Sequence, residues 1–469
     1  MKKITMIKYI CVLSLITACT KKNATELLAD ATQDSQDQSS GDSGGGDSGG
    51  AAVSFNGSGY NSVDFASDYS GALASAIQSD GKIVAVGYGY HSASSNAEDL
   101  GVARFNADGT LDEDFASYGV FNYSFGTYGN STFTDQATSV KINANGKIVV
   151  AGFYSINSTN QAISVLQLNA DGTLDSNFGT AGVFTLDPTS GSDRINSMAI
   201  SATGKIILAG QSTATGNNDL LLVQLNADGT LDTNFATQGV YSSDLGSNND
   251  IITSVVSAAD NFIYLGGYTG SSNINGFLMR LTAAGAVDGT WASPAPIDNS
   301  GQNDFIKSIA VNGSSIVFAG FTQDGAGNTK FLIGKTSLTG SLDNQFGTNG
   351  LIVPTIGNCN CDMDYADQAT SVMFDANNKI VVAGFAYNSG YAKFAVTRYS
   401  SLGVLDSSYA NQGIFMGCNE ANQNCLMTSA FMQPDGKIVF AGNYSETIHT
   451  HVILGRLTAN GNLDISTDE

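Results

Sequence analysis

The sequence is poor in histidine, in basic residues and in long apolar runs, and each shortage excludes a class of protein. Only three of the 469 residues are histidine. Triad chemistry would therefore need His91, His449 or His451, and no His-Glu-x-x-His motif is present. With 20 Lys and Arg against 42 Asp and Glu, the chain is too acidic to favour nucleic acid or anionic lipid as a partner. No run reaches the roughly 18 apolar residues of a membrane-spanning helix.

Proline and charge are also scarce, with 5 prolines and 13% charged residues, whereas glycine is abundant at 54. Together with a regular pattern, this composition argues against a disordered chain. Residues 19–52 are the exception, because Gly, Ser, Asp and Gln dominate much of this segment. Such a segment buries too little apolar area to fold, and we interpret it as a flexible tether.

Residues 1–18 are typical of a secretory leader, with a basic start and a short apolar segment. The segment ends in Ile16-Thr17-Ala18-Cys19, which resembles the bacterial lipobox. The resemblance implies that Cys19 is lipidated and anchors the protein to a membrane. Thr20 and Lys21 follow in place of the aspartate that favours the inner membrane, so the expected location is the outer membrane. The alternative is an ordinary leader, cleaved near Ala18, that leaves a free protein.

A short β-branched run that ends in glycine recurs seven times and organises the rest of the chain. The clearest copy is residues 147–152, KIVVAG. Such short apolar runs predict fully buried strands. The unit is about sixty residues long, as expected of a repeat architecture. The closing anchor glycines are Gly87, Gly152, Gly210, Gly267, Gly320, Gly384 and Gly442.

Each unit contains four strand-like segments joined by recognisable turns. In the second unit, residues 139–142 lead through an Asn-Gly hairpin turn into the anchor run. A third strand at 165–168 leads into the turn 169–175, NADGTLD, and residues 183–186 form the fourth. Seven such units predict an all-β fold, a seven-bladed β-propeller of four-stranded antiparallel blades over residues 53–469.

The two ends of the repeat region complement each other. A turn aspartate recurs seven times, and six copies are followed three residues later by an aromatic residue. No aromatic follows Asp464 before the chain stops, but residues 55–60, FNGSGY, match the missing piece at the other end. We therefore predict that a strand at about 59–65 completes the last blade. The turn aspartates are Asp112, Asp175, Asp232, Asp288, Asp343, Asp406 and Asp464.

The combination of NADGTLD, a following Phe-Gly and GKIVVAG resembles the delta-60 repeat of bacterial surface and secreted proteins. This resemblance implies a β-propeller, from a family without an assigned general activity, and it brings no catalytic residue. It covers the whole of 53–469. The fourth unit departs most, with Trp291, Pro294 and Pro296, which puts its outer strand in doubt.

A residue that every unit carries is more readily explained by structure than by function. We interpret the turn aspartates as caps of backbone N–H groups, with calcium binding by Asn169, Asp171 and Asp175 as the alternative. A long polar residue in each third strand is interpreted as a donor to the neighbouring blade. A basic ring that binds a ligand is its alternative. These residues are Arg104, Gln167, Gln224, Arg280, Lys335, Arg398 and Arg456.

Function is expected where the repeat varies. The first-to-second and third-to-fourth turns share one face and are uniform, whereas the other two connections share the opposite face and differ in length. Binding residues concentrate on variable loops held by a rigid scaffold. The candidate binding residues on that face are Tyr88, Tyr90, Tyr128, Asp362, Asp364, Tyr365 and Glu420.

Four cysteines also fall in these connections. In an exported protein an even number favours two disulfides, most simply Cys359–Cys361 and Cys418–Cys425, with cross-loop pairing as an alternative. A four-thiolate zinc site is the rival, but the Cys-x-Cys spacing suits it poorly.

The three histidines are predicted in loops of the first and last blades, which ring closure would make neighbours. His91, His449 and His451 could bind zinc with an open position, although three solvated loop histidines are the simpler interpretation. We expect no resident cofactor.

The sequence favours a monomeric, lipid-anchored propeller that binds a protein or a polysaccharide through its variable loops without chemistry of its own. One alternative is an extracellular carbohydrate-active enzyme that uses loop carboxylates. The other is a purely structural envelope protein.

Overall fold

The computed structural model describes the repeat region almost completely. The described residues are 55–66, 69–90, 98–126, 134–214, 216–246, 249–291, 295–357, 366–446 and 449–465. The chain divides into two units, Met1–Ala52 and Val53–Glu469, and all described residues belong to the second. The leader, Cys19 and the tether lie outside them and stay predictions. Among the described residues, no helix is long and apolar enough to cross a membrane.

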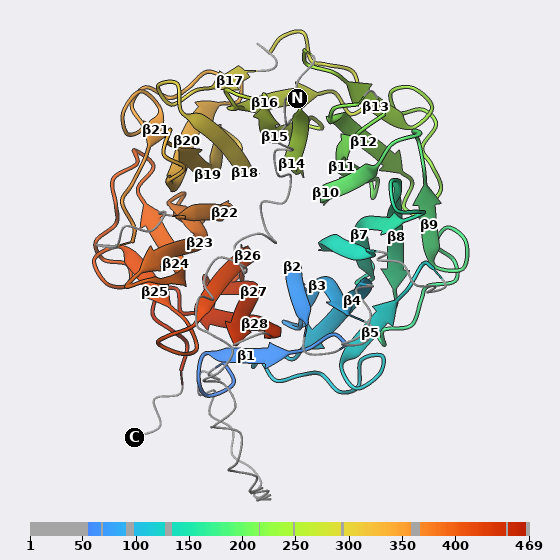
Figure 1. Ribbon diagram of the computed structural model, residues 1–469, viewed down its shortest axis with the longest axis horizontal. Helices are drawn as coiled ribbons and strands as arrows, with labels where there is room; N and C mark the ends of the chain where they lie inside the picture. The colour runs from blue at the N-terminus through green and yellow to red at the C-terminus, as the bar shows by residue number, and fades with distance from the viewer. Residues whose placement is uncertain are drawn as a thin grey trace, which may run out of the picture. The chain divides into compact units, whose positions relative to one another are not determined.

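Seven four-stranded antiparallel sheets stand as blades around a common axis (Figure 1). The predicted seven-bladed β-propeller is confirmed. Blades 1 to 3 are β2 (Ser70–Ile77), β3 (Ile83–Tyr90), β4 (Glu98–Phe105), β5 (Val120–Tyr123); β6 (Gln136–Ile142), β7 (Ile148–Ser155), β8 (Gln161–Leu168), β9 (Val183–Leu186); and β10 (Asp193–Ile200), β11 (Ile206–Ser212), β12 (Asp219–Leu225), β13 (Val240–Ser243).

Blades 4 to 7 continue the same order from the innermost strand outward. They are β14 (Asp250–Ser257), β15 (Ile263–Thr269), β16 (Asn275–Leu281), β17 (Ala295–Ile297); β18 (Asn303–Val311), β19 (Ser315–Gln323), β20 (Thr329–Ser337), β21 (Leu351–Ile352); β22 (Gln368–Phe374), β23 (Ile380–Asn388), β24 (Tyr391–Tyr399), β25 (Ile414–Gly417); and β26 (Asn424–Met432), β27 (Ile438–Glu446), β28 (His449–Leu457), β1 (Tyr60–Val63).

Strand β1 closes the ring by pairing with β28 as the outer strand of blade 7 (Figure 1). Tyr60 pairs with Gly455 and Val63 pairs with Val452, so the predicted completion of the last blade is confirmed. The strand is shorter than the predicted 59–65. Fold and closure together place residues from the two ends of the chain side by side.

Anchor glycines are required because the innermost strand approaches the second strand closely at that point. A Cβ atom on Gly152 would lie 1.8 Å from the backbone oxygen of Gln136. The innermost strand carries a β-bulge here, between Ala137 and Ser139, and every other blade has a register shift at the equivalent place. Glycine is the residue that lets two backbones come this close.

A serine beside the bulge links the innermost strands of neighbouring blades at six of the seven junctions. The Ser139 hydroxyl accepts a hydrogen bond from the Met198 N–H at 3.2 Å. Six of the seven junctions repeat this contact, through Ser139, Ser197, Ser254, Ser308, Ser371 and Ser429. The crowded innermost strand requires a small residue at this position, and the inter-blade hydrogen bond explains why that residue is serine in six blades.

The turn aspartates and the third-strand basic residues join one blade to the next. Arg104 donates to Asp112 at 2.5 Å and also to the Ala170 backbone oxygen in blade 2. Lys82 adds a second cation, 2.7 Å from Asp112. The predicted inter-blade donor role is confirmed for all five basic residues, since Arg280, Lys335, Arg398 and Arg456 make equivalent bonds.

The strands extend further than the sequence indicated toward the variable connections. Tyr88 and Tyr90 lie in β3, and His449 and His451 lie in β28, so their predicted placement in loops is wrong. Continued pairing explains the difference, because Tyr90 pairs with Glu98 and Glu446 pairs with His449. The doubtful outer strand of blade 4 is present as β17, although it has only three residues.

Candidate functional site

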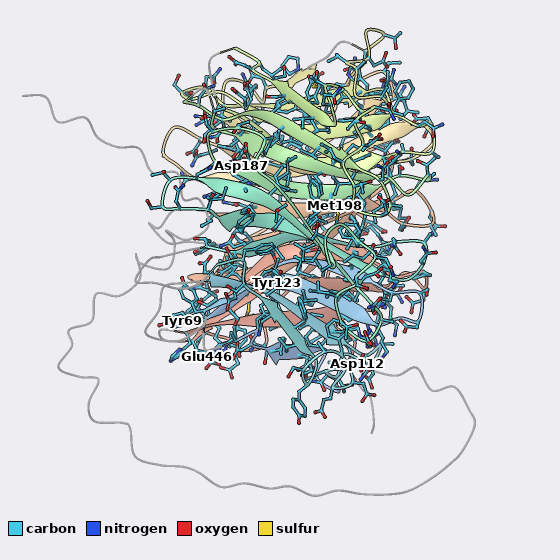
Figure 2. The ribbon with its side chains drawn as sticks, turned by 90° about the vertical axis from the view of Figure 1, so that its right-hand side faces the viewer. Tyr69, Asp112, Tyr123, Asp187, Met198 and Glu446 are labelled. Carbon is cyan, nitrogen blue, oxygen red and sulfur yellow. A yellow bond between two sulfur atoms is a disulfide. The ribbon has the colours of Figure 1, made fainter. Side chains whose placement is uncertain are left out.

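The face that carries the second-to-third and fourth-to-first connections is called the variable face here, and the opposite one the turn face. Figure 2 shows Tyr69 and Glu446 toward one side of the propeller, with Asp112 toward the other. Tyr69 precedes an innermost strand, Glu446 ends a second strand, and Asp112 belongs to a uniform turn. Residues at the strand ends, such as Tyr69 and Glu446, thus lie on the variable face, and the uniform turns lie on the turn face.

Aromatic rings from both ends of the chain meet on the variable face where blades 7 and 1 adjoin. The Tyr69 ring lies 5.6 Å from the Tyr90 ring and 5.5 Å from the His449 ring, measured between centroids. Tyr88 continues the group at 6.5 Å from Tyr90. These four rings and His451, 6.3 Å from His449, are called the closure cluster. Ring closure brings together residues about 380 positions apart.

Contacts with the surrounding strands hold the closure cluster in place. Tyr69 forms a parallel β-bridge with Thr450, between the two histidines. The Tyr88 ring lies against Gly71, where any Cβ atom would come within 2.6 Å of the ring. His451 is fixed on both sides, because its Nδ1 atom lies 2.9 Å from an Asp64 carboxylate oxygen and its ring stacks on Tyr444 at 5.0 Å.

A buried carboxyl group adjoins the aromatic rings. Glu98 is 6% exposed and accepts a hydrogen bond from the Gln136 amide at 2.5 Å. Burial raises the pKa of Glu98, against hydrogen bonds from Gln136 and Tyr90 that lower it. Burial, followed by the charge of Glu98, raises the pKa of Tyr90 to about 12. The Tyr90 hydroxyl donates a hydrogen bond to the Glu98 carboxyl group.

Tyr69 stands at a position where three other blades carry a structural asparagine. Its equivalents Asn249, Asn303 and Asn424 each accept a backbone N–H from the preceding blade, at 2.9–3.1 Å. Tyrosine has no side-chain oxygen that can make this short-range contact from the same position. The hydrogen bond that blades 4, 5 and 7 use is therefore absent in blade 1, as it is in blades 2, 3 and 6, which carry Thr134, Ser192 and Ala366.

Seven residues near the starts of the innermost strands hold the incoming connections. Asp135 accepts the Phe125 N–H at 2.9 Å and the Ser155 N–H at 3.3 Å. Each residue stands 17 positions before its anchor glycine, or 16 in blade 5. The set, called the connection-holding residues, was missed by the sequence reasoning although this constant offset could have revealed it. Its members are Ser70, Asp135, Asp193, Asp250, Asp304, Asp367 and Cys425.

In blade 7 a disulfide between Cys418 and Cys425 holds the connection instead, with Cα atoms 5.9 Å apart. Lys393 adds three hydrogen bonds to the backbone oxygens of Glu420, Ala421 and Gln423. Glu420 therefore lies on a connection fixed at several points, with its side chain exposed. Cys359 and Cys361 lie outside the described residues, and their pairing stays a prediction.

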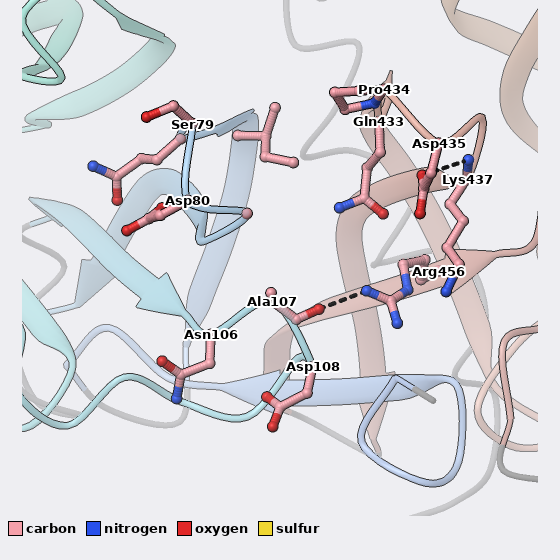
Figure 3. Close-up of a pocket in the computed structure, with 13 residues that line it drawn as sticks. Ser79, Asp80, Asn106, Ala107, Asp108, Gln433, Pro434, Asp435, Lys437 and Arg456 are labelled. Carbon is pink, nitrogen blue, oxygen red and sulfur yellow. Dashed lines mark hydrogen bonds between the residues drawn. The ribbon is translucent and has the colours of Figure 1, made fainter. Parts of the chain in front are cut away.

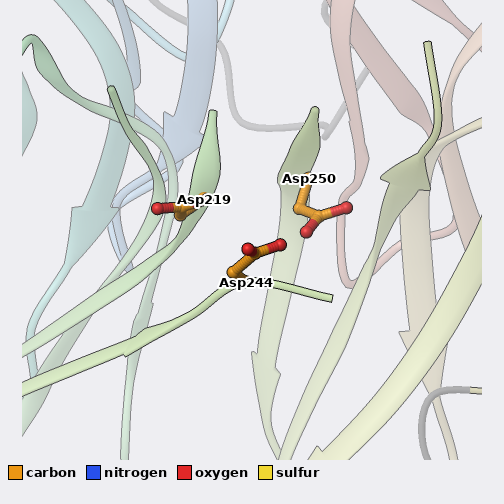
Figure 4. Close-up of side chains that lie close together, drawn as sticks. All are labelled: Asp219, Asp244 and Asp250. Carbon is orange, nitrogen blue, oxygen red and sulfur yellow. The ribbon is translucent and has the colours of Figure 1, made fainter. Parts of the chain in front are cut away.

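Three carboxylates gather at the junction of blades 3 and 4 (Figure 4). The ligand atoms of Asp219, Asp244 and Asp250 lie within 4.8 Å of one another, the one such group in the described part of the chain. Asp250 belongs to the connection-holding set and accepts the Leu245 N–H at 2.6 Å. We assign the group to the fold, since no second feature indicates a bound ion.

The turns that could have bound calcium already contact a cation of the protein. Lys147 contacts Asn169 and lies 3.1 Å from Asp175. Asp171 accepts the Thr173 N–H at 3.0 Å. These contacts favour the capping interpretation. The zinc hypothesis stays a prediction, because His91 lies outside the described residues.

Of the other predicted binding residues, Tyr128, Asp362, Asp364 and Tyr365 also lie outside the described residues. The structure brings Tyr88, Tyr90, His449 and His451 together, and it leaves Glu420 apart on the blade 7 connection. Sequence reasoning missed Tyr69 and Glu98. Tyr69 could have been found as the one aromatic at its position among the seven units.

The model described as "Domain of unknown function (DUF5122) beta-propeller" matches residues 78–115, 144–178, 202–235, 376–409 and 433–466. The chain is similar to this family in five of its seven blades. The matched segments fall in blades 1, 2, 3, 6 and 7, and they support a β-propeller family. The name delta-60 and the lipoprotein character stay predictions. A search of curated proteins found no match.

The solved structures that resemble this chain are only distantly similar to it. A polysaccharide lyase described as PL25-Ulvanlyase shares 11% identity over 89% of this chain and 98% of its own, with a TM-score of 0.49. Polysaccharide lyase Uly1 shares 9% over 82% and 90%, at 0.46. Sqt1 from Chaetomium thermophilum shares 13% over 84% and 83%, at 0.42. Likenesses this weak support no inference about ligand or activity.

Proposed function

We propose that this protein is a binding β-propeller that holds a polysaccharide on its variable face, at the closure cluster, without transforming it. The observation that carries the proposal is the aromatic ring of Tyr69. A position that accepts an inter-blade hydrogen bond in blades 4, 5 and 7 carries an aromatic ring in blade 1, beside the rings of Tyr90 and His449. Tyr69 is the one aromatic residue at this position among the seven blades, and its ring is only partly buried, which supports a role in binding.

The chemistry of the closure cluster suits a sugar better than a protein partner. Tyrosine rings offer an apolar surface to the C–H face of a pyranose and keep a polar edge for its hydroxyl groups. The Tyr90 hydroxyl and the Glu98 carboxyl group are hydrogen-bonded to each other, so a sugar hydroxyl that binds beside them would share that contact. The chain carries a formal net charge of −22, which disfavours a polyanionic ligand. The proposed ligand is therefore a neutral or amino-bearing polysaccharide.

Binding of neutral and amino glycans on an array, followed by titration calorimetry with a retained oligosaccharide, tests the proposal. Tyr69→Asn installs the residue that blades 4, 5 and 7 carry at this position, so the fold should survive. We expect at least a tenfold loss of affinity, about 1.4 kcal/mol. Tyr268→Gln is the matched control. Tyr268 lies in blade 4 on the same face, and the substitution removes its aromatic contact with Phe305 of blade 5. It should bind as the parent does.

Two outcomes would overturn the proposal. Turnover of the glycan would show that the protein is a carbohydrate-active enzyme and does more than bind. An equal loss of affinity in the Tyr69→Asn and Tyr268→Gln proteins would show that the closure cluster is not the site.

The membrane attachment inferred from the lipobox is part of the same proposal. Lipidation at Cys19 would place the propeller at the outer membrane, where an extracellular polysaccharide is accessible. Cell fractionation of the parent and of Cys19→Ser tests it. We expect the parent in the membrane fraction and the variant outside it, and the same distribution for both would contradict the anchor.

A further inference from the structure

The outer rim of the propeller carries a further group of aromatic rings, where the outer strand of blade 1 meets blade 2. The Phe125 ring stacks on the Tyr154 ring with centroids 4.6 Å apart, and the Tyr123 ring lies 4.8 Å from Phe125. All three side chains are partly exposed. In Figure 2, Tyr123 lies on the side of the propeller that faces the viewer, between Tyr69 and Asp112. These three rings are called the rim cluster.

The rim cluster lines a pocket of about 700 Å³, together with Val183, Phe184 and Thr185 of the outer strand β9. A volume of this size is typical of ligand sites, which hold about 300–1,000 Å³. The Tyr154 hydroxyl and the side chain of Thr185 are hydrogen-bonded to each other, and Thr185 is exposed. The pocket therefore combines aromatic surface with hydroxyl groups at its edge, a combination that suits a sugar.

The exposure of these rings is not a requirement of the fold, because the equivalent ring at the junction of blades 7 and 1 is buried. Phe65 has the position of Phe125, since each donates its N–H group to a connection-holding residue. Phe65 is 2% exposed and fills space beside Gly89 and Gly101. A Cβ atom on Gly101 would lie 2.4 Å from the Phe65 ring, so glycine is what admits the ring here.

In blade 2 the two glycines are replaced by Tyr154 and Ser164. Their side chains occupy the equivalent space, so Phe125 stacks on Tyr154 and stays partly exposed. Tyr123 is likewise the one aromatic residue at its position among the seven blades. The equivalents of Tyr123 are Val63, Leu186, Ser243, Ile297, Pro354 and Gly417.

Contacts between blades 1 and 2 connect the rim cluster with the closure cluster. Glu98, which is hydrogen-bonded to the Tyr90 hydroxyl, also accepts a hydrogen bond from the Gln136 amide. The neighbouring residue Asp135 accepts the Phe125 N–H at 2.9 Å. The innermost and outer strands of a blade are three strand spacings of about 4.8 Å apart, or about 14 Å. A chain of several sugars can therefore reach both clusters, whereas one sugar cannot.

The larger pocket on the turn face, about 790 Å³ where blades 7 and 1 meet, offers no comparable surface (Figure 3). Its three turn aspartates each accept a backbone N–H from two residues further on, as Asp80 does from Lys82 at 3.1 Å. Its cations are paired, since Lys437 and Arg456 lie 3.0 Å and 2.6 Å from Asp464. We assign this pocket to the fold.

We propose that the rim cluster is a second sugar-binding site, and that one extended polysaccharide chain occupies it together with the closure cluster. The inference rests on the proposed function, because the ligand is the same. The partly exposed rings offer apolar surface to the C–H faces of pyranose rings, and Tyr154 and Thr185 offer hydroxyl groups to the sugar hydroxyls. A chain held at two points binds more tightly than a chain held at one. The protein then recognises a stretch of chain and not a terminal sugar.

Titration calorimetry of the full-length chain with two series of oligosaccharides, each from two to eight sugars long, tests the proposal. The probes are cello-oligosaccharides, which are neutral, and chitosan oligosaccharides, which bear amino groups. We expect the affinity within the series that binds to rise at least tenfold from the shortest to the longest member. Equal affinity at every length would overturn the second site and leave the closure cluster standing. Absence of binding by both series would overturn both proposals.

Residues of other blades supply a variant that keeps the fold. The triple variant Tyr123→Leu, Phe125→Leu and Tyr154→Thr installs side chains that other blades carry at these positions. It should bind the disaccharide as the parent does and lose the gain in affinity with length. Tyr69→Asn, in contrast, should weaken binding at every length. A triple variant that keeps the gain would contradict the proposal.

The control removes aromatic rings from outer strands elsewhere. Tyr241→Leu with Phe415→Leu changes two partly exposed rings in blades 3 and 6, neither of which lines the rim pocket. This variant should keep the parent's gain in affinity with length. If it loses the gain as the triple variant does, the effect is a general one on the outer strands, and the rim cluster is not a binding site.

Discussion

Five buried aspartates combine an ionisable group with a fixed backbone contact at the scale of single residues. Burial raises the pKa of Asp193, Asp250, Asp304 and Asp367, and it raises the pKa of Asp135 to about 6. The exposed residues Asp108, Asp171 and Asp228 behave in the opposite way, because hydrogen bonds from neighbouring threonines lower their pKa values. The two sets therefore affect stability in different pH ranges.

We predict that the propeller loses stability as pH rises from 4 to 7. In that range the folded state binds more protons than the unfolded state, because the folded pKa values of the five aspartates lie above the ordinary value of 3.8. The rise in the pKa of Asp135 from 3.8 to about 6 corresponds to a change of about 3 kcal/mol in the free energy of unfolding between low pH and a pH above both values. Asp135→Asn should shrink the difference between thermal midpoints at pH 4 and pH 7.5.

Asp171→Asn is the control for this prediction, because the lowered pKa of Asp171 affects stability mainly below about pH 4, as the unfolded carboxyl group takes up its proton. It should leave the difference between pH 4 and pH 7.5 unchanged. A midpoint that rises from pH 4 to pH 7.5, or an Asp135→Asn protein with the parent's pH dependence, would contradict the assignment.

At the scale of strands and connections, the repeat period predicted most of what is present. The hairpin turns and the residues of β9, 183–186, agree with the prediction from sequence. The strand ends on the variable face were missed, because β3 and β28 continue beyond the anchor pattern into aromatic and polar residues. Pairing with the neighbouring strand determines those ends, and hydrophobic periodicity does not report it.

Cys425 illustrates how one connection can be held by different chemistry. It occupies the position of Asp135 and its equivalents, and it is fully buried. We predict that Cys418→Ser with Cys425→Ala lowers the free energy of unfolding by about 2–3 kcal/mol, the range for a short closed loop. Cys418→Ser with Cys425→Asp should recover about 1 kcal/mol, because the carboxylate accepts backbone N–H groups of the connection as it does elsewhere.

Denaturant unfolding with and without reductant measures both effects. The parent should lose stability in reductant, whereas neither variant should respond. An aspartate variant less stable than the alanine variant would show that position 425 is not equivalent to the connection-holding aspartates.

At the scale of the whole molecule, each blade inserts one aromatic ring under a turn glycine of the next. A Cβ atom on Gly172 would lie 2.9 Å from the Phe115 ring, and Gly109 has the same relation to Phe55 at 2.6 Å. Phe55 is thus the aromatic of blade 7, supplied from the other end of the chain. The complementary ends predicted this closure.

The closure cluster was only partly predictable. Ring closure indicated that His449 lies near blade 1, but the contact with Tyr69 depends on how far the innermost strand extends toward the variable face. The serine bridges and the partners of Asp135 depend on radial packing between blades. A repeat period fixes the order of the blades and leaves these distances open.

Blade 7 should be the least stable blade of the ring, because its outer strand β1 is joined to β28 only by noncovalent contacts. Phe55→Ala removes a fully buried ring that also lies 4.9 Å from the Arg456 guanidinium, and it should lower stability by about 3–5 kcal/mol. Phe178→Ala makes the same change in blade 2, where β9 continues from β8 through the chain. We expect both variants to lose a similar free energy of unfolding but to differ in which amides lose protection from exchange.

Hydrogen exchange followed by mass spectrometry distinguishes the two variants. In Phe55→Ala, amides of Tyr60–Val63 and His449–Leu457 should exchange faster than in the parent, because four paired residues alone then hold β1 on β28. In Phe178→Ala, the corresponding amides of β8 and β9 should change less, because their connecting turn limits separation. If β28 keeps the parent's protection in Phe55→Ala, the ring is not closed by the N-terminal strand in solution, and the closure cluster that depends on it is wrong as well.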